Sequence, residues 1–205
     1  QSIVGSLVYL VQCTRYDIAY SVQQLARFMS KPATVHMEAA KPVLRHLRGA
    51  TDFCIVFKKG NFTLVGYSDA SFNLGPLDRE RPCSGWMFFL SGGSISFGSA
   101  LQKTPANSTT EAELIALSTW IQGFFNFDLC SDAQTALHLA ANQSFSSRTK
   151  HISTKFQLLR EWVDSNRIVL RYVKGGSMPA DGLTKQLERT AHQRFLGLVQ
   201  DLGVC

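Results

Sequence analysis

The feature that most constrains the fold is a change of hydrophobic period near Gly49. Before it, apolar residues recur at helical spacing, which predicts helices at 17–29 and 34–47. Pro42 lies inside the second of these and predicts a kink there. After Gly49 the apolar residues gather in short runs bounded by turn residues, which is typical of strands. The chain therefore begins with a helical segment and continues as a mixture of strands and helices.

The order of the later elements indicates the fold class. Strands are expected at 53–57, 62–67, 85–90, 95–97, 125–130 and 168–173, and helices at 108–121, 133–141, 151–164 and 188–202. An antiparallel meander followed by alternating helices and strands favours an α/β fold with a mixed five-stranded sheet flanked by helices. We expect a helical segment at 1–55 and an α/β domain at 56–205.

Charge and cysteine content narrow the class of protein. The net charge is +6, and seven of the basic residues lie between Arg148 and Lys174, so an acidic partner is plausible. The cysteines number five and show no metal-binding spacing, which favours reduced thiols and an intracellular protein. The apolar run Ile3 to Val11 is too short to span a bilayer. Because the chain begins with Gln, we expect it to be cut from a longer polypeptide.

Acidic residues stand at positions where charge is costly. Asp69 and Asp132 follow apolar strands, Glu113 lies among apolar residues of a helix, and Asp181 follows the last strand. Strand ends are also where sites form in open α/β sheets. Each acid has a structural alternative: the aspartates can cap helices or turns, and Glu113 can form a capping box with Thr110. A second box, Ser108 with Glu111, would leave Glu113 free.

Six local motifs occur in one order along the chain. They are Tyr67-Ser68-Asp69-Ala70-Ser71, Ser84-Gly85-Trp86-Met87-Phe88-Phe89, Ser108-Thr109-Thr110-Glu111-Ala112-Glu113-Leu114, Ser131-Asp132-Ala133-Gln134, Arg148-Thr149-Lys150-His151-Ile152 and Ala180-Asp181-Gly182-Leu183-Thr184-Lys185. They resemble the ribonuclease H domain at the C-terminus of copia-type retrotransposon polyproteins. Residues 2–19 resemble the segment that connects that domain to reverse transcriptase.

The resemblance implies a ribonuclease H-like fold and cleavage of the RNA strand in RNA–DNA hybrids during reverse transcription. It places the catalytic, metal-binding carboxylates on Asp69, Glu113, Asp132 and Asp181. Their oxygens are suitable ligands for two Mg²⁺ or Mn²⁺ ions. The implied partners are the hybrid and the reverse transcriptase domain of the same polyprotein, without a membrane. The implied location is the cytoplasm, in a virus-like particle, or the nucleus.

Basic residues are candidates for contacts with the nucleic-acid backbone. The candidates are Lys103, Arg148, Lys150, His151, Lys155, Lys174 and Lys185. The run between Arg148 and Lys174 can equally be an ordinary solvated face. His151 is a better candidate for a nucleic-acid contact or a helix cap than for a metal ligand. The tryptophans lie in apolar patterns, which favours core packing over base stacking.

Departures from the family pattern leave a second function open. Ser71 and Ala133 stand where the family usually has Asp and Asn, and 97–101 has lost a basic, aromatic character. A diverged, catalytically silent nucleic-acid-binding or scaffolding module is the alternative to the nuclease. A transposase or integrase on the same fold class is disfavoured, because the motifs point elsewhere and no zinc-binding His/Cys cluster is present.

Overall fold

The structure is a computed structural model that describes residues 1–60, 62–72, 81–121, 126–141 and 154–202, without the side chains of residues 154 and 155. The strands are β1 (Val65–Ser71), β2 (Cys83–Leu90), β3 (Gly93–Leu101), β4 (Phe127–Ser131) and β5 (Ile168–Tyr172). The helices are α1 (Ser2–Cys13), α2 (Ala19–Ala26), α3 (Thr34–Gly49), α4 (Thr109–Thr119), α5 (Gln134–Ala141), α6 (Thr154–Asp164) and α7 (Arg189–Leu202). Short 3₁₀ turns are η1 (Tyr16–Ile18), η3 (Gly175–Ser177) and η4 (Pro179–Leu183).

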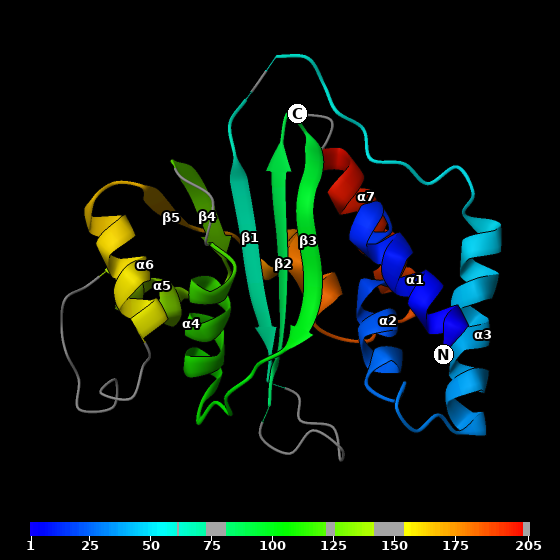
Figure 1. Ribbon diagram of the computed structural model, residues 1–205. Coiled ribbons are helices and arrows are strands. Elements are labelled where there is room, and N and C mark those ends of the chain that lie inside the picture. The colour runs from blue at the N-terminus through cyan, green and yellow to red at the C-terminus, as the bar shows by residue number, and fades with distance from the viewer. Residues whose placement is uncertain (61, 73–80, 122–125, 142–153, 203–205) are drawn as a thin grey trace.

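The strands form one five-stranded sheet in the order β3-β2-β1-β4-β5 (Figure 1). β1 pairs antiparallel with β2 and parallel with β4, while β2–β3 is antiparallel and β4–β5 is parallel. The expected mixed five-stranded sheet flanked by helices is therefore confirmed. The β2–β3 hairpin turns at Ser91 and Gly92, whose φ values of 51° and 77° suit the two-residue turns that match strand twist.

Two expected strands differ from the structure. Residues 53–57 form no strand; Phe53 instead packs edge-on against Tyr16, with ring centroids 4.9 Å apart, and beneath the guanidinium of Arg15. The strand expected at 62–67 lies three residues later, at Val65–Ser71. This shift matters for the site, because Asp69 lies inside the strand rather than at its end.

Helices cover both faces of the sheet, and successive residues of β2 pack into different layers. Phe88 belongs to a core that includes Leu114 and Leu117 of α4 together with residues of α5 and α6. Met87 belongs to a second core that contains Phe195 of α7. Figure 1 shows α4, α5 and α6 on one side of the sheet, and α7 with the N-terminal helices on the other. The central strands are therefore buried on both faces.

The N-terminal helices form a small core of their own and also contribute to the sheet. Leu7, Val22 and Val43 join α1, α2 and α3. Tyr16 of η1 enters the second core of the sheet, where its ring lies 5.6 Å from that of Phe97 and 6.0 Å from that of Phe195. The N-terminal segment is thus fixed to both β3 and α7 through one aromatic side chain.

A buried ion pair reinforces this junction. Asp17 accepts hydrogen bonds from Arg15 at 2.9 and 2.6 Å, and its carboxylate lies 2.7 Å from the imidazole of His46 on α3. The Arg15 guanidinium also donates to the carbonyl of Ala50, and His192 of α7 contacts the Asp17 carbonyl at 2.9 Å. Each polar group at this junction has a partner, which is the condition for burying charge without a large cost. Within the described ranges, no helix is long and apolar enough to cross a membrane.

Replacement of Tyr16 tests how strongly the two parts of the chain depend on each other. Tyr16→Ala removes a ring that is 3% exposed, so we expect the free energy of unfolding to fall by about 3–5 kcal/mol, as for other buried aromatic truncations. Denaturant titration followed by circular dichroism measures the change. Tyr9→Ala is the matched control, because Tyr9 on α1 is 66% exposed and its loss should cost almost nothing. Equal effects of the two substitutions would contradict this account.

Candidate metal centre

Asp69 lies on β1, the middle strand of the sheet, and is only 6% exposed. Gly85 of β2 stands directly opposite it in the strand register. A Cβ atom at Gly85 would lie 2.7 Å from the carbonyl oxygen of Ala180 and 2.8 Å from Leu183. Gly85 therefore leaves the space in which η4, with Asp181, packs against the sheet beside Asp69.

Asp132 follows β4 directly, and β4 runs parallel to β1. The turn after the strand is fixed by the hydroxyl of Ser131, which accepts a hydrogen bond from the amide of Ala133. The carboxylate of Asp132 faces η3, since a Cβ at Gly175 would lie 2.9 Å from its Oδ2. Two neighbouring parallel strands thus bring Asp69 and Asp132 together.

Glu113 reaches the same place from α4. Ser108 caps this helix by accepting a hydrogen bond from the amide of Glu111, and the Glu111 carboxylate accepts one from the amide of Asn107. The capping role expected for Ser108 and Glu111 is confirmed, although the return bond comes from Asn107 rather than from Ser108. Glu113 is therefore not used as a cap, and its Oε2 is buried without a partner.

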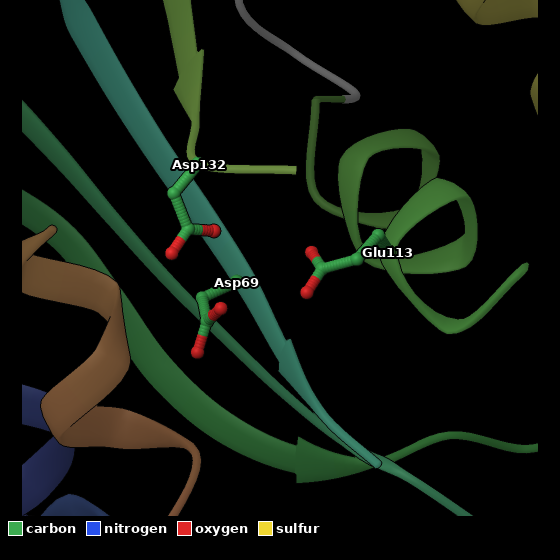
Figure 2. A group of neighbouring side chains, drawn as sticks. All are labelled: Asp69, Glu113 and Asp132. Atoms are coloured by element: carbon green, nitrogen blue, oxygen red, sulfur yellow. The ribbon is translucent and has the colours of Figure 1, made fainter. Parts of the chain in front are cut away.

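The three carboxylates converge. Ligand oxygens of Asp69, Glu113 and Asp132 all lie within 4.8 Å of one another. Figure 2 shows the Glu113 side chain pointing from its helix toward the two aspartates. Hard oxygen donors at this spacing, one of them a buried oxygen without a hydrogen bond, fit a divalent cation such as Mg²⁺ or Mn²⁺.

Burial and mutual repulsion make this cluster costly when it is ionised. Burial raises the pKa of Asp69 to about 6. The hydrogen bond from the Thr184 hydroxyl lowers this pKa, whereas the charges of Asp181 and Asp132 raise it further. Burial and the charge of Asp69 raise the pKa of Glu113 to about 9. The pKa of Asp132 is also raised, mainly by burial. A bound divalent cation would relieve both penalties.

Asp181 stands beside this cluster rather than in it. Among the described residues, the mutually close set contains Asp69, Glu113 and Asp132. The Asp181 carboxylate is instead ion-paired with Lys185, four positions further along the chain. Its charge nevertheless raises the pKa of all the other three. The structure therefore brings three of the four predicted ligands together and places the fourth next to them, held by a lysine.

Thr184 is a site residue that the sequence did not single out. It is 2% exposed, and its hydroxyl donates a hydrogen bond to Oδ2 of Asp69 at 2.7 Å. The same hydroxyl lies 3.0 Å from the carbonyl oxygen of Asp181. Thr184 thus connects the carboxylate on β1 to the turn that carries Asp181. The sequence placed Thr184 in the motif that contains Asp181, but it did not indicate the hydrogen bond. Thr184 and Asp69 are 115 positions apart, so no local sequence pattern reports their contact.

The structure describes some of the residues predicted to contact nucleic acid, namely Lys103, Lys174 and Lys185. Lys103 is exposed between β3 and α4, and Lys174 is exposed next to Gly175 and hence near Asp132. Lys185 is exposed and paired with Asp181. Arg148, Lys150 and His151 lie outside the described residues, as does the side chain of Lys155.

Two arginines of the basic run between Arg148 and Lys174 make contacts within the protein. Arg171 pairs with Asp128 at 2.5 Å. Arg160 donates to the carbonyl of Leu139 and covers the ring of Phe156. Trp86 and Trp120 stack on each other with ring centroids 3.5 Å apart, as expected for core residues. Arg171 and Arg160 are therefore already engaged within the part of the chain that the structure describes.

Comparisons with known proteins give the family. No protein-family model matches the chain. It is 39% identical to the retrovirus-related Pol polyprotein of transposon TNT 1-94 from Nicotiana tabacum, over 97% of this chain and 16% of that protein. It is 36% identical to the corresponding polyprotein of transposon RE1 from Arabidopsis thaliana, over 95% of this chain and 14% of that protein. The chain thus spans about a sixth or less of these polyproteins.

A solved structure similar to this one is the N-terminal ribonuclease H domain of a Mycobacterium tuberculosis protein, with 14% identity and a TM-score of 0.43. The likeness covers 64% of this chain and 97% of that one. The relationship to the transposon polyproteins extends over nearly all of this chain and includes both its N-terminal helices and its mixed sheet. The chain is therefore a relative of the retrovirus-related Pol polyproteins of plant transposons and corresponds to one segment of each.

Proposed function

We propose that the chain is a metal-dependent endoribonuclease of the copia type that hydrolyses the RNA strand of RNA–DNA hybrids during reverse transcription. The observation that carries the proposal is the convergence of Asp69, Glu113 and Asp132 from β1, α4 and the end of β4. Ionised carboxylates that are wholly or partly buried this close together are destabilising unless they take up protons or a cation binds them. A purely structural role gives no reason for three different elements to direct acids to one point.

In this proposal the ligands are Asp69, Glu113, Asp132 and Asp181, with Asp69 central because β1 lies in the middle of the sheet. Two Mg²⁺ or Mn²⁺ ions would supply activation of the attacking water and neutralise charge on the leaving 3′ oxygen. The protein's own contribution is to hold the carboxylates in place before substrate arrives. Thr184 orients Asp69, and the capped start of α4 fixes the direction of Glu113.

The substrate would be held by its backbone. Lys103 and Lys174 are exposed on loops next to the carboxylate-bearing elements, where they can contact phosphates. Recognition of the hybrid would rest on groove shape and the 2′-hydroxyl rather than on base identity. We further propose that the chain acts beside a reverse transcriptase domain of the same polyprotein, inside the cell in a virus-like particle or the nucleus. The division into 1–55 and 56–205 remains a prediction.

A cleavage assay tests the proposal. The native chain should cut the RNA strand of a labelled hybrid in Mg²⁺ or Mn²⁺, and Asp69→Asn should lose activity by at least about 100-fold, because an amide is a weaker, uncharged ligand. Asp164→Asn, on the exposed end of α6, is the matched control and should cut like the native chain. Hybrid binding by the native chain without cleavage in either metal would support the silent module instead.

Thr184 should affect metal use without being a ligand. Thr184→Val keeps the shape of the side chain but removes the hydrogen bond to Asp69, so we expect activity at low Mg²⁺ to fall about tenfold, as for other groups that orient ligands. Thr184→Ser keeps the hydroxyl and should retain most activity. Titration of the cleavage rate against Mg²⁺ concentration provides the measurement. If the serine and valine variants behave alike, the hydroxyl does not orient Asp69.

The raised pKa values make stability depend on pH in a defined direction. Because the pKa of Glu113 rises from 4.5 to about 9 on folding and that of Asp69 from 3.8 to about 6, their protonated forms favour the folded state. In EDTA, their contribution to stability is complete below the ordinary pKa values and is lost as the pH rises through about 6 and then about 9. The melting temperature should therefore fall over this range.

Glu113→Gln supplies the control for that measurement, because it removes the group with the higher pKa. Its melting temperature in EDTA should change less with pH than that of the native chain in the upper part of the range. Added Mn²⁺ should raise the melting temperature of the native chain most at high pH, where the carboxylates are ionised. An identical pH dependence in the two proteins would show that Glu113 does not carry this penalty.

A further inference from the structure

We propose that the ammonium group of Lys185 holds the Asp181 carboxylate when no metal is bound. A divalent cation that binds Asp181 would displace this ammonium group. This inference rests on the proposed function and assigns Lys185 a role in metal loading instead of the nucleic-acid contact expected from the sequence. The observation behind it is that Asp181 pairs with Lys185 while Asp69, Glu113 and Asp132 lie together.

The geometry of the pair supports exchange. Lys185 follows Asp181 by one turn, and its Nζ is ion-paired with Oδ1 of Asp181. The Lys185 side chain is 48% exposed and that of Asp181 is 37% exposed, so solvent and ions can reach both. The direct contact in an exposed pair of this kind is weak, because solvent screens it. A divalent cation can therefore replace the ammonium at the carboxylate at small cost.

The surroundings explain why a cation is needed there. Asp181 lies close enough to Asp69, Glu113 and Asp132 for its charge to raise the pKa of each. The ammonium of Lys185, paired with Asp181, offsets part of the repulsion among the acids.

The backbone places Lys185 with little freedom. The preceding residue, Thr184, is buried and bound through its hydroxyl to Asp69. Gly85 lets the same turn lie against the sheet, where a Cβ would be 2.8 Å from the Thr184 methyl group. Adjacent residues of one fixed turn therefore act on two carboxylates: Thr184 on Asp69 and Lys185 on Asp181.

The two roles of the ammonium lead to opposite effects when it is removed. Without it, the metal-free carboxylates repel more strongly, so the metal-free protein should be less stable. A divalent ion then meets no competing cation and a more negative site, so it should bind more tightly. A lysine that only maintained the shape of the turn would, on removal, weaken metal binding as well as stability. The sign of the change in metal affinity separates the two roles.

Calorimetric titration of MnCl₂ into the full chain tests the inference. We expect Lys185→Gln to bind Mn²⁺ about 3–10-fold more tightly than the native chain, a size typical of one nearby unit charge after screening. Its melting temperature in EDTA should be lower than that of the native chain. Lys185→Arg retains the charge and should bind Mn²⁺ like the native chain.

Lys59→Gln is the matched control, because Lys59 is exposed in the coil between α3 and β1 and the substitution removes the same charge. It should leave Mn²⁺ affinity unchanged. Unchanged or weaker Mn²⁺ binding by Lys185→Gln would overturn the inference. Equally tighter binding by Lys59→Gln would also overturn it, because the effect would then come from the net charge of the protein and not from Lys185 at the site. Failure of the native chain to bind Mn²⁺ at all would remove the proposed function itself, and this inference with it.

Discussion

The burial of the Asp69 carboxylate in the middle of the sheet is the constraint on which the rest of the site depends. A buried carboxylate needs hydrogen bonds or an opposite charge. Asp69 accepts a hydrogen bond from Thr184, and two further acids converge on the same point. Acids that repel one another stay this close only if the backbone that carries them is held firmly in place. β1 provides such a rigid frame, because it is bonded to β2 on one side and to β4 on the other.

The N-terminal helices belong to the same frame. Tyr16 packs in a core that also contains Met178, Ala180 and Leu183, the apolar residues of the turn that carries Asp181. The same core includes Phe195 of α7. The position of Asp181 therefore depends on residues from both ends of the chain. A segment that sequence similarity alone would treat as a connection thus takes part in holding the fourth carboxylate.

Local sequence patterns predicted the order of the elements, the cap at Ser108 and the place of Asp132 after β4, because each depends on neighbouring residues. These patterns gave the wrong structure or no role where contacts between distant parts of the chain determine the conformation. Residues 53–57 have the apolar character of a strand, yet Phe53 is used to cover Tyr16 and Arg15 instead. Thr184 and Gly85 contribute through contacts with distant elements, which no period in the sequence reports. The family motifs contained both residues without indicating what they do.

The departures from the family pattern bear on catalysis less than their number suggests. Ser71 and Ala133 cannot supply a carboxylate, but the mutually close set within the described residues is made by Asp69, Glu113 and Asp132 without them. The departures at Ser71 and Ala133 therefore leave the convergence of the three acids intact. Of the basic residues, Arg171 and Arg160 make contacts within the protein. Lys103 and Lys174 are exposed, and Lys174 precedes Gly175, which lies next to Asp132. The carboxylates are fixed by the packing of the whole fold, whereas the exposed lysines are not. Under the proposed function, further substitutions would therefore weaken hybrid binding before they disturb the carboxylate cluster.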